Sequence, residues 1–206
     1  ISIIENEIIN QLRGAASEKN ISIFVRGAAS ELARTWSAMQ SNVITAILVI
    51  FLLLVILLKS FSMPLIILLV VPVASTGGIA ALALLNQFIK QPLDMLTMLG
   101  FVILTGIVVN NAILLVEQTI LQVKEEGMQI YDAIVEATRN RIRPIFMSTL
   151  TSLFGLVPLV IFPGAGSELY RGIGVVVFGG LALSTFATLL IVPPLLSVFS
   201  KSIQKN

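Results

Sequence analysis

The sequence predicts an all-α membrane protein with five transmembrane helices. Hydrophobic residues make up 56% of the 206 residues and charged residues only 12%, which is about half the charged share of an ordinary soluble domain. The apolar residues gather in five stretches, each long enough to cross a bilayer. No acidic residue lies in the middle of such a stretch. These observations exclude a soluble globular domain as the fold class.

Residues 1–38 precede the first stretch and are mixed in character. Four of their apolar side chains recur at helical spacing: Ile3, Ile4, Ile8 and Leu12. Residues 21–25 resemble a short strand ahead of Gly27. A segment this short buries too little apolar surface to fold alone. We therefore expect residues 1–38 to be the incomplete end of a larger folded domain.

Five apolar spans follow, each near the roughly 20 residues that cross about 30 Å of hydrocarbon at about 1.5 Å per residue. We place them at Met39–Leu58, Met63–Leu85, Met95–Val116, Pro144–Phe162 and Gly172–Phe199. The sequence thus divides into residues 1–38, a transmembrane bundle at residues 39–200 and a tail at residues 201–206.

Prolines mark the starts or bends of several spans. Pro64 and Pro144 suit a first helical turn, whereas Pro72 predicts a kink because proline has no backbone N–H. Pro193 and Pro194 should disturb the final turns of the last span.

The link between the third and fourth spans, residues 117–143, is longer than the others. Ile130, Ile134 and Ala137 recur there at spacings of four and three, and charged residues occupy other positions. This pattern predicts an amphipathic helix on the cytoplasmic side, lying against the membrane surface.

The basic residues predict the orientation of the spans. With residues 1–38 outside, the inner side holds most of the positive charge: Lys59, Lys124, Arg139, Arg141, Arg143, Lys201 and Lys205. The short outer loops then hold Lys90 and Arg171. We therefore place residues 1–38 outside and the C-terminus in the cytoplasm.

Asn110 and Asn111 place two adjacent amides inside the third span. Hydrocarbon offers an amide no hydrogen-bond partner, so such side chains normally face other helices or a polar cavity. Neighbours on a helix differ by about 100°, so at least one amide should point at another helix. The pair marks a candidate functional site. The alternative is that the two amides only hold neighbouring helices together, through hydrogen bonds that average ~0.6 kcal/mol.

Arg141 and Arg143 stand directly before the fourth span, and hydroxyl residues follow them: Ser148, Thr149, Thr151 and Ser152. The arginines can be ordinary topology anchors that reach the headgroups. The hydroxyl run is less ordinary, since it can line a wet passage.

Small residues gather in the second and last spans: Ala74, Ser75, Thr76, Gly77, Gly78, Gly172, Gly174, Gly179 and Gly180. Because small residues let helices approach closely, they predict a tightly packed bundle.

Several residue types that catalysis needs are missing. The sequence has no cysteine and no histidine, and its spans hold no paired carboxylates. We therefore expect no catalytic residue, metal or cofactor, and no nucleic-acid partner. A proton-driven transporter needs a group that changes charge inside the membrane. In such a transporter, that group would come from a segment outside this chain.

Five short motifs follow one another along the spans: Lys-Ser-Phe-Ser-Met-Pro at 59–64, Val-Pro at 71–72, Gly-Ile-Val-Val-Asn-Asn-Ala-Ile at 106–113, Arg-Ile-Arg-Pro-Ile at 141–145 and Gly-Leu-Val-Pro-Leu at 155–159. Residues 164–168, 179–180 and 192–193 extend the set. In this order, between about Ser30 and Phe199, the motifs resemble the resistance–nodulation–division (RND) efflux transporters, most closely the hydrophobe and amphiphile branch that includes multidrug exporters.

The resemblance implies that the five spans are helices eight to twelve of a twelve-helix transporter, and that residues 1–38 end a periplasmic porter-type region. It implies proton antiport in the bacterial inner membrane, with the N-terminal half as partner. It further implies a homotrimer and, in Gram-negative bacteria, a periplasmic adaptor and an outer-membrane channel.

The resemblance also implies roles for single residues. Asn110 falls at the proton-relay position of the tenth helix, with Asn111 beside it, and many multidrug exporters have a lysine there. Arg141 and Ser148 fall where the family has an arginine and a hydroxyl linked to the proton path. The aspartates that load the proton would lie on a fourth helix outside this chain. The alternatives are a lipid- or protein-export relative and a non-catalytic structural membrane subunit.

Overall fold

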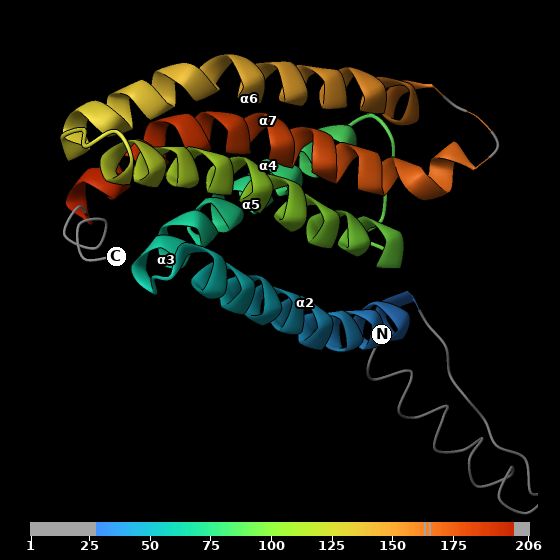
Figure 1. Ribbon diagram of the computed structural model, residues 1–206. Helices are drawn as coiled ribbons and strands as arrows, with labels where there is room; N and C mark the ends of the chain where they lie inside the picture. The colour runs from blue at the N-terminus through green and yellow to red at the C-terminus, as the bar shows by residue number, and fades with distance from the viewer. Residues whose placement is uncertain (1–27, 163, 165, 200–206) are drawn as a thin grey trace, which may run out of the picture. The chain divides into compact units, whose positions relative to one another are not determined.

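The computed structural model describes residues 28–162, 164 and 166–199 (Figure 1). These residues form helices and loops, without a strand. The chain divides into two compact units, residues 1–37 and 38–206. The expected helical stripe from Ile3 to Leu12, the expected strand at 21–25 and the tail at 201–206 lie outside the described residues.

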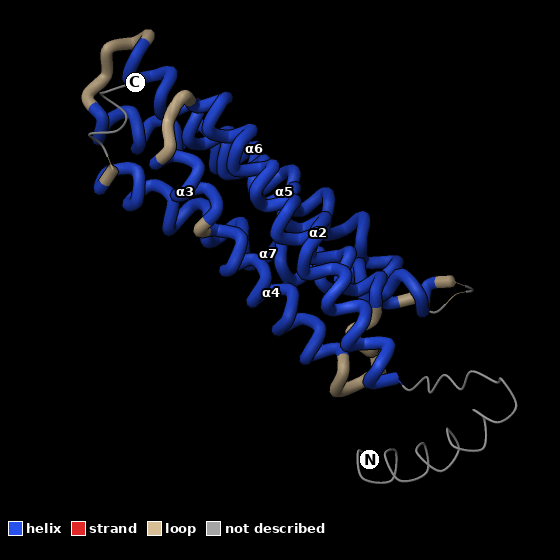
Figure 2. The backbone as a smooth tube through the Cα atoms, turned by 90° about the horizontal axis from the view of Figure 1, so that it is seen from below, coloured by secondary structure: helices blue, strands red, loops and turns tan. Residues whose placement is uncertain are grey.

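Six helices make up the described part of the chain: α2 (Ala28–Leu58), α3 (Ser62–Leu68), α4 (Val70–Leu85), α5 (Met95–Lys124), α6 (Ile130–Ile161) and α7 (Ser167–Val198). They contain five spans long and apolar enough to cross a membrane, since α3 and α4 together form one of them. The predicted all-α class with five transmembrane helices is confirmed. Figure 2 shows the long helices of the second unit running side by side.

The second span is interrupted at Leu69, between α3 and α4. Pro72 explains the break, because its nitrogen cannot donate to the carbonyl of Leu68 and its ring crowds that carbonyl. Leu69 keeps helical backbone angles, so the helical hydrogen bonding is interrupted near Pro72 while the kink itself stays a prediction. The other prolines behave differently: Pro144 lies inside α6 and not at its start, and α7 continues through Pro193 and Pro194. Both expectations about those prolines are wrong.

The segment with the apolar stripe at Ile130, Ile134 and Ala137 is helical, but it is not a separate helix on the membrane surface. It forms the first turns of α6 and continues into the fourth span without a break. Ile134 and Ala137 are buried in the main hydrophobic core, together with residues of other helices. The stripe packs against protein, which satisfies the same apolar face that a membrane surface would have covered.

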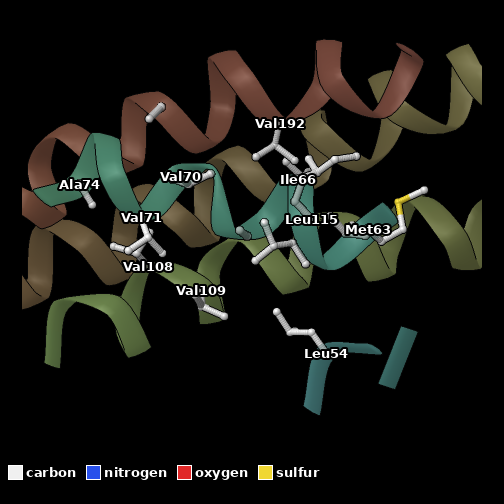
Figure 3. Close-up of a cluster of buried hydrophobic side chains, with 14 of the residues drawn as sticks. Leu54, Met63, Ile66, Val70, Val71, Ala74, Val108, Val109, Leu115 and Val192 are labelled. Carbon is white, nitrogen blue, oxygen red and sulfur yellow. The ribbon is translucent and has the colours of Figure 1, made fainter. Parts of the chain in front are cut away.

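The core of the second unit lies around α7, which packs against α3, α4, α5 and α6. Figure 3 shows side chains from several helices meeting there, among them Val70 of α4, Val108 and Leu115 of α5 and Val192 of α7. The buried share is 44% for the Ser62–Leu85 span and for α5, and 56% for α7, but only 11% for the apolar windows of α2 and α6. The second span, α5 and α7 therefore carry most of the packing.

Glycines bring α4 and α7 into backbone contact. A Cβ atom added to Gly77 would lie 2.6 Å from the carbonyl oxygen of Gly179 and 2.7 Å from Cβ of Leu183. A Cβ added to Gly179 would overlap the side chain of Ala81. The predicted tight packing of the small residues is seen at this crossing.

Candidate functional site: a polar face on α5 and α6

α5 and α6 form an antiparallel pair that carries the four candidate residues, two on each helix. Nη2 of Arg141 donates a hydrogen bond to Oε1 of Gln118 at 3.1 Å and so links the two helices. Seven residues back along α5 lies Asn111, and seven residues forward along α6 lies Ser148. Both are about 10 Å from the Arg141–Gln118 pair along the helix axes. Asn111 and Ser148 therefore lie at the same level of the bundle.

Asn110 lies at the centre of an uncovered face of α5, which we call the open face. Its residues recur at spacings of three, four and seven and are all exposed: Leu99, Ile103, Gly106, Asn110, Glu117 and Leu121. A Cβ added to Gly106 would meet no atom within 4 Å. The open face is therefore a surface to which the rest of the described chain contributes nothing.

The two amides have different surroundings. Asn110 is exposed, whereas Asn111 is half-buried on the side of α5 that leads toward Gln118. Among the described residues, neither side chain has a hydrogen-bond partner. Each amide keeps its donors and its acceptor free.

Ser148 is exposed on α6, and its hydroxyl donates to the carbonyl oxygen of Ile145 at 3.0 Å. That bond lies within its own helix, so the hydroxyl oxygen remains able to accept. Arg141 is half-buried. Ser148 and Arg141 are seven residues apart and so share one face of α6, as Asn111 and Gln118 share one face of α5.

Thr149 holds α6 in this orientation. Its Oγ1 lies 2.9 Å from Oγ1 of Thr185 on α7, and both threonines are buried. The Thr185 hydroxyl donates to the carbonyl oxygen of Leu181 at 2.8 Å, so its single proton is engaged. Thr149 is therefore the donor of the hydrogen bond between the helices. Since neighbours differ by about 100°, turning Thr149 inward leaves Ser148 on the outside.

Sequence reasoning missed Gln118 as the partner of Arg141 and Thr185 as the partner of Thr149. The spacing carried a signal for the first: Gln118 follows Asn111 by seven residues, as Ser148 follows Arg141. The second needs the register between α6 and α7, which a single sequence does not provide.

The prediction that Arg171 lies in an outer loop is wrong. α7 begins at Ser167, so Arg171 lies within the helix and is buried. The described residues contain no cluster of acidic side chains that could hold a metal ion. The candidate residues offer hydrogen bonds from two amides, one hydroxyl and one arginine, and the carboxylate of Glu117 lies on the open face.

The fold and this face define a multi-pass helical membrane protein with polar groups on an uncovered side. The model of the AcrB/AcrD/AcrF family matches residues 6–200. The chain therefore belongs to that family, which is a family of RND multidrug efflux transporters. The resemblance seen in the sequence motifs is confirmed.

Three relatives illustrate the match. The chain is 36% identical to multidrug resistance protein MdtC of Erwinia tasmaniensis over 173 residues, which cover 82% of the chain and 16% of that protein. The MdtC proteins of Salmonella paratyphi A and Pectobacterium carotovorum are 35% and 34% identical, over 85% and 86% of the chain and 17% of each protein. The chain thus spans about a sixth of the length of these relatives.

Proposed function

We propose that this chain is the C-terminal transmembrane part of a proton-coupled RND efflux transporter that exports hydrophobic or amphiphilic compounds across a bacterial inner membrane. The family supports the transporter class. The MdtC relatives, which are named as multidrug resistance proteins, support the substrate class. The excess of basic residues on one side supports a cytoplasmic C-terminus.

The exposed amide of Asn110 is the observation that supports the mechanism best. It lies in an apolar span and has no partner among the described residues. Lipid is a poor neighbour for such a group, because hydrocarbon leaves its hydrogen bonds unmade. In our proposal, the N-terminal half of the transporter covers the open face and places a carboxylate against Asn110.

The carboxylate and the Asn110 amide have different roles because only the carboxylate can change its charge. An amide cannot change charge, so the carboxylate carries the coupling proton and Asn110 hydrogen-bonds to it. Ser148 and Arg141 lie on the neighbouring helix, where they can bind water or the carboxylate as its charge changes. Asn111 shares one face of α5 with Gln118, and its free amide can hydrogen-bond to water there. The complete transporter would be a homotrimer that works with a periplasmic adaptor and an outer-membrane channel.

The replacement Asn110→Leu in the complete transporter tests this mechanism. It keeps the side-chain size but removes both hydrogen-bonding groups. We expect drug export to fall by at least about tenfold, because one charge-assisted hydrogen bond is lost. Export is measured as drug efflux from energised cells at matched protein levels. Asn42→Leu is the matched control, because Asn42 is also an exposed asparagine at the start of a span.

Wild-type export by Asn110→Leu would remove Asn110 from the mechanism. If the variants at Asn110, Arg141 and Ser148 changed stability alone, the chain would be a structural subunit. Loss of lipid or protein export in place of drug export would favour the other branches of the superfamily.

A further inference from the structure

A groove lined by apolar side chains lies where α4, α6 and α7 meet. Its lining includes Ala81 and Leu84 of α4, Phe88 just after that helix, Val160 of α6, and Val175 and Phe178 of α7. The groove is shallow and largely open to its surroundings, with a volume of about 240 Å³. These residues come from the ends of α4 and α6 and the first turns of α7, so the groove lies at one end of the bundle. In the orientation proposed above, that end faces the outer leaflet.

Arg171 stands beside this groove on α7. It precedes Val175 by four residues and Phe178 by seven, so the three share one face of the helix. Arg171 is only 6% exposed, and its Nε atom has no hydrogen-bond partner. Nor does the described part of the chain offer its guanidinium an ion pair. An arginine is a permanent cation, so burying it without a partner carries a large cost.

The two acidic side chains that the structure describes at this end, Asp94 and Glu168, do not compensate for the charge. Oδ1 of Asp94 accepts hydrogen bonds from the backbone N–H of Thr97 at 2.8 Å and from its hydroxyl at 2.6 Å. Asp94 therefore caps α5. Glu168, one turn before Arg171, is exposed to solvent. Lys90 adds a second cation in the loop between α4 and α5, next to the buried Gln91, whose amide nitrogen borders Gly172 on α7.

We propose that Arg171 and this groove bind an anionic phospholipid of the outer leaflet, with its phosphate at the guanidinium and one acyl chain along the groove. Helical side chains point toward the N-terminus of their helix, so the guanidinium is directed away from the bilayer centre, toward the headgroups. Phe178 lies about 10 Å deeper along α7, at about 1.5 Å per residue. A phosphate supplies an anion that no described residue offers to Arg171, and the acyl chain covers the apolar lining.

The lipid site rests on the membrane placement of the chain and not on transport. Its test therefore measures lipid binding to the complete transporter, without any export step. The detergent-purified transporter is titrated with phosphatidylglycerol or with phosphatidylcholine, and bound lipid is counted by native mass spectrometry. We expect Arg171→Gln to weaken phosphatidylglycerol binding by at least about tenfold, because a charge-assisted hydrogen bond is lost. The neighbouring Lys90→Gln should weaken it less than about twofold, because this exposed cation is screened.

The replacement Leu84→Trp tests the acyl-chain half of the proposal. Leu84 lines the groove and is 60% exposed, so a larger side chain fills the groove without entering the core. We expect weaker binding of both lipids. Leu53→Trp on α2 is the matched control, since Leu53 is 61% exposed and lies outside the groove. It should bind lipid like the unmodified protein.

Several results would overturn the proposal. Unchanged phosphatidylglycerol binding in Arg171→Gln would show that Arg171 does not bind the headgroup. If Lys90→Gln weakened phosphatidylglycerol binding as much as Arg171→Gln, the lipid would be attracted by overall charge and not by a specific site. If Leu84→Trp and Leu53→Trp changed lipid binding equally, the groove would not be the acyl-chain site. If Arg171→Gln does not assemble, Leu84→Trp still tests the site, because it leaves the arginine in place.

Discussion

Single hydroxyls and amides give the α5–α6 pair its orientation. Thr149 and Arg141 each make one hydrogen bond to another helix, to Thr185 and Gln118 respectively. Such bonds are modest in membranes because the unfolded state also finds partners. These bonds matter because they fix the rotation of each helix: Thr149 turned toward α7 leaves Ser148 exposed on the outer side of α6.

The replacement Thr149→Val tests this role. Valine has nearly the same shape but cannot donate, so the bond to Thr185 is lost while Thr185 keeps its bond to Leu181. We expect a loss of about 0.5–1.5 kcal/mol in the free energy of unfolding, measured by detergent denaturation of the complete transporter.

Thr151→Val is the control for Thr149→Val. Thr151 is exposed, and its hydroxyl bonds only to the carbonyl of Met147 in its own helix. Equal losses in the two variants would show that the contact between the helices adds no stability.

At the scale of helices, the sequence predicted where apolar spans begin and end more reliably than where helices do. The predicted boundaries at Leu58, Leu85 and Met95 agree with the structure. α5, however, continues past the expected end at Val116. α6 begins before the expected start at Pro144. Hydropathy reports the boundary of the apolar region, and a helix can continue beyond it wherever its next turns have packing partners.

The candidate site was predictable in its residue types and not in its contacts. Asn110 and Asn111 are conspicuous because amides are costly in hydrocarbon. Which of the two is exposed depends on the rotation of α5, and that rotation is set by core residues such as Val108 and Ala112. Arg171 was misplaced because charge favours a loop, whereas packing in the first turns of α7 buries it.

The replacement Gly77→Ala tests the crossing of α4 and α7. The added methyl group would lie too close to the carbonyl oxygen of Gly179, so the helices must move apart. We expect about 1–3 kcal/mol of destabilisation, as for overpacking in other well-packed sites. Thermal unfolding of the complete transporter measures it.

Gly155→Ala is the control for Gly77→Ala, because a Cβ at Gly155 meets no described atom within 4 Å. This control should be neutral or slightly stabilising, since alanine favours helix over glycine. A Gly77→Ala protein as stable as the Gly155→Ala protein would contradict the close backbone approach.

At the largest scale, the second unit has a well-packed core around α7 and a side on which the open face of α5 is not covered by the described residues. An apolar surface alone would suit lipid. The exposed amide of Asn110 and hydroxyl of Ser148 do not, which is why we assign this side to the N-terminal half of the transporter. The proposed lipid site lies elsewhere, on α4, α6 and α7.

The structure of the complete transporter in a lipid bilayer tests the central claim most directly. The quantity to measure is the distance from the Asn110 side-chain amide to the nearest carboxylate oxygen. Our account predicts a carboxylate from the N-terminal half within hydrogen-bond reach, about 3 Å, in at least one transport state. An Asn110 side chain that faces lipid, with no acidic side chain opposite it in any state, would contradict the account.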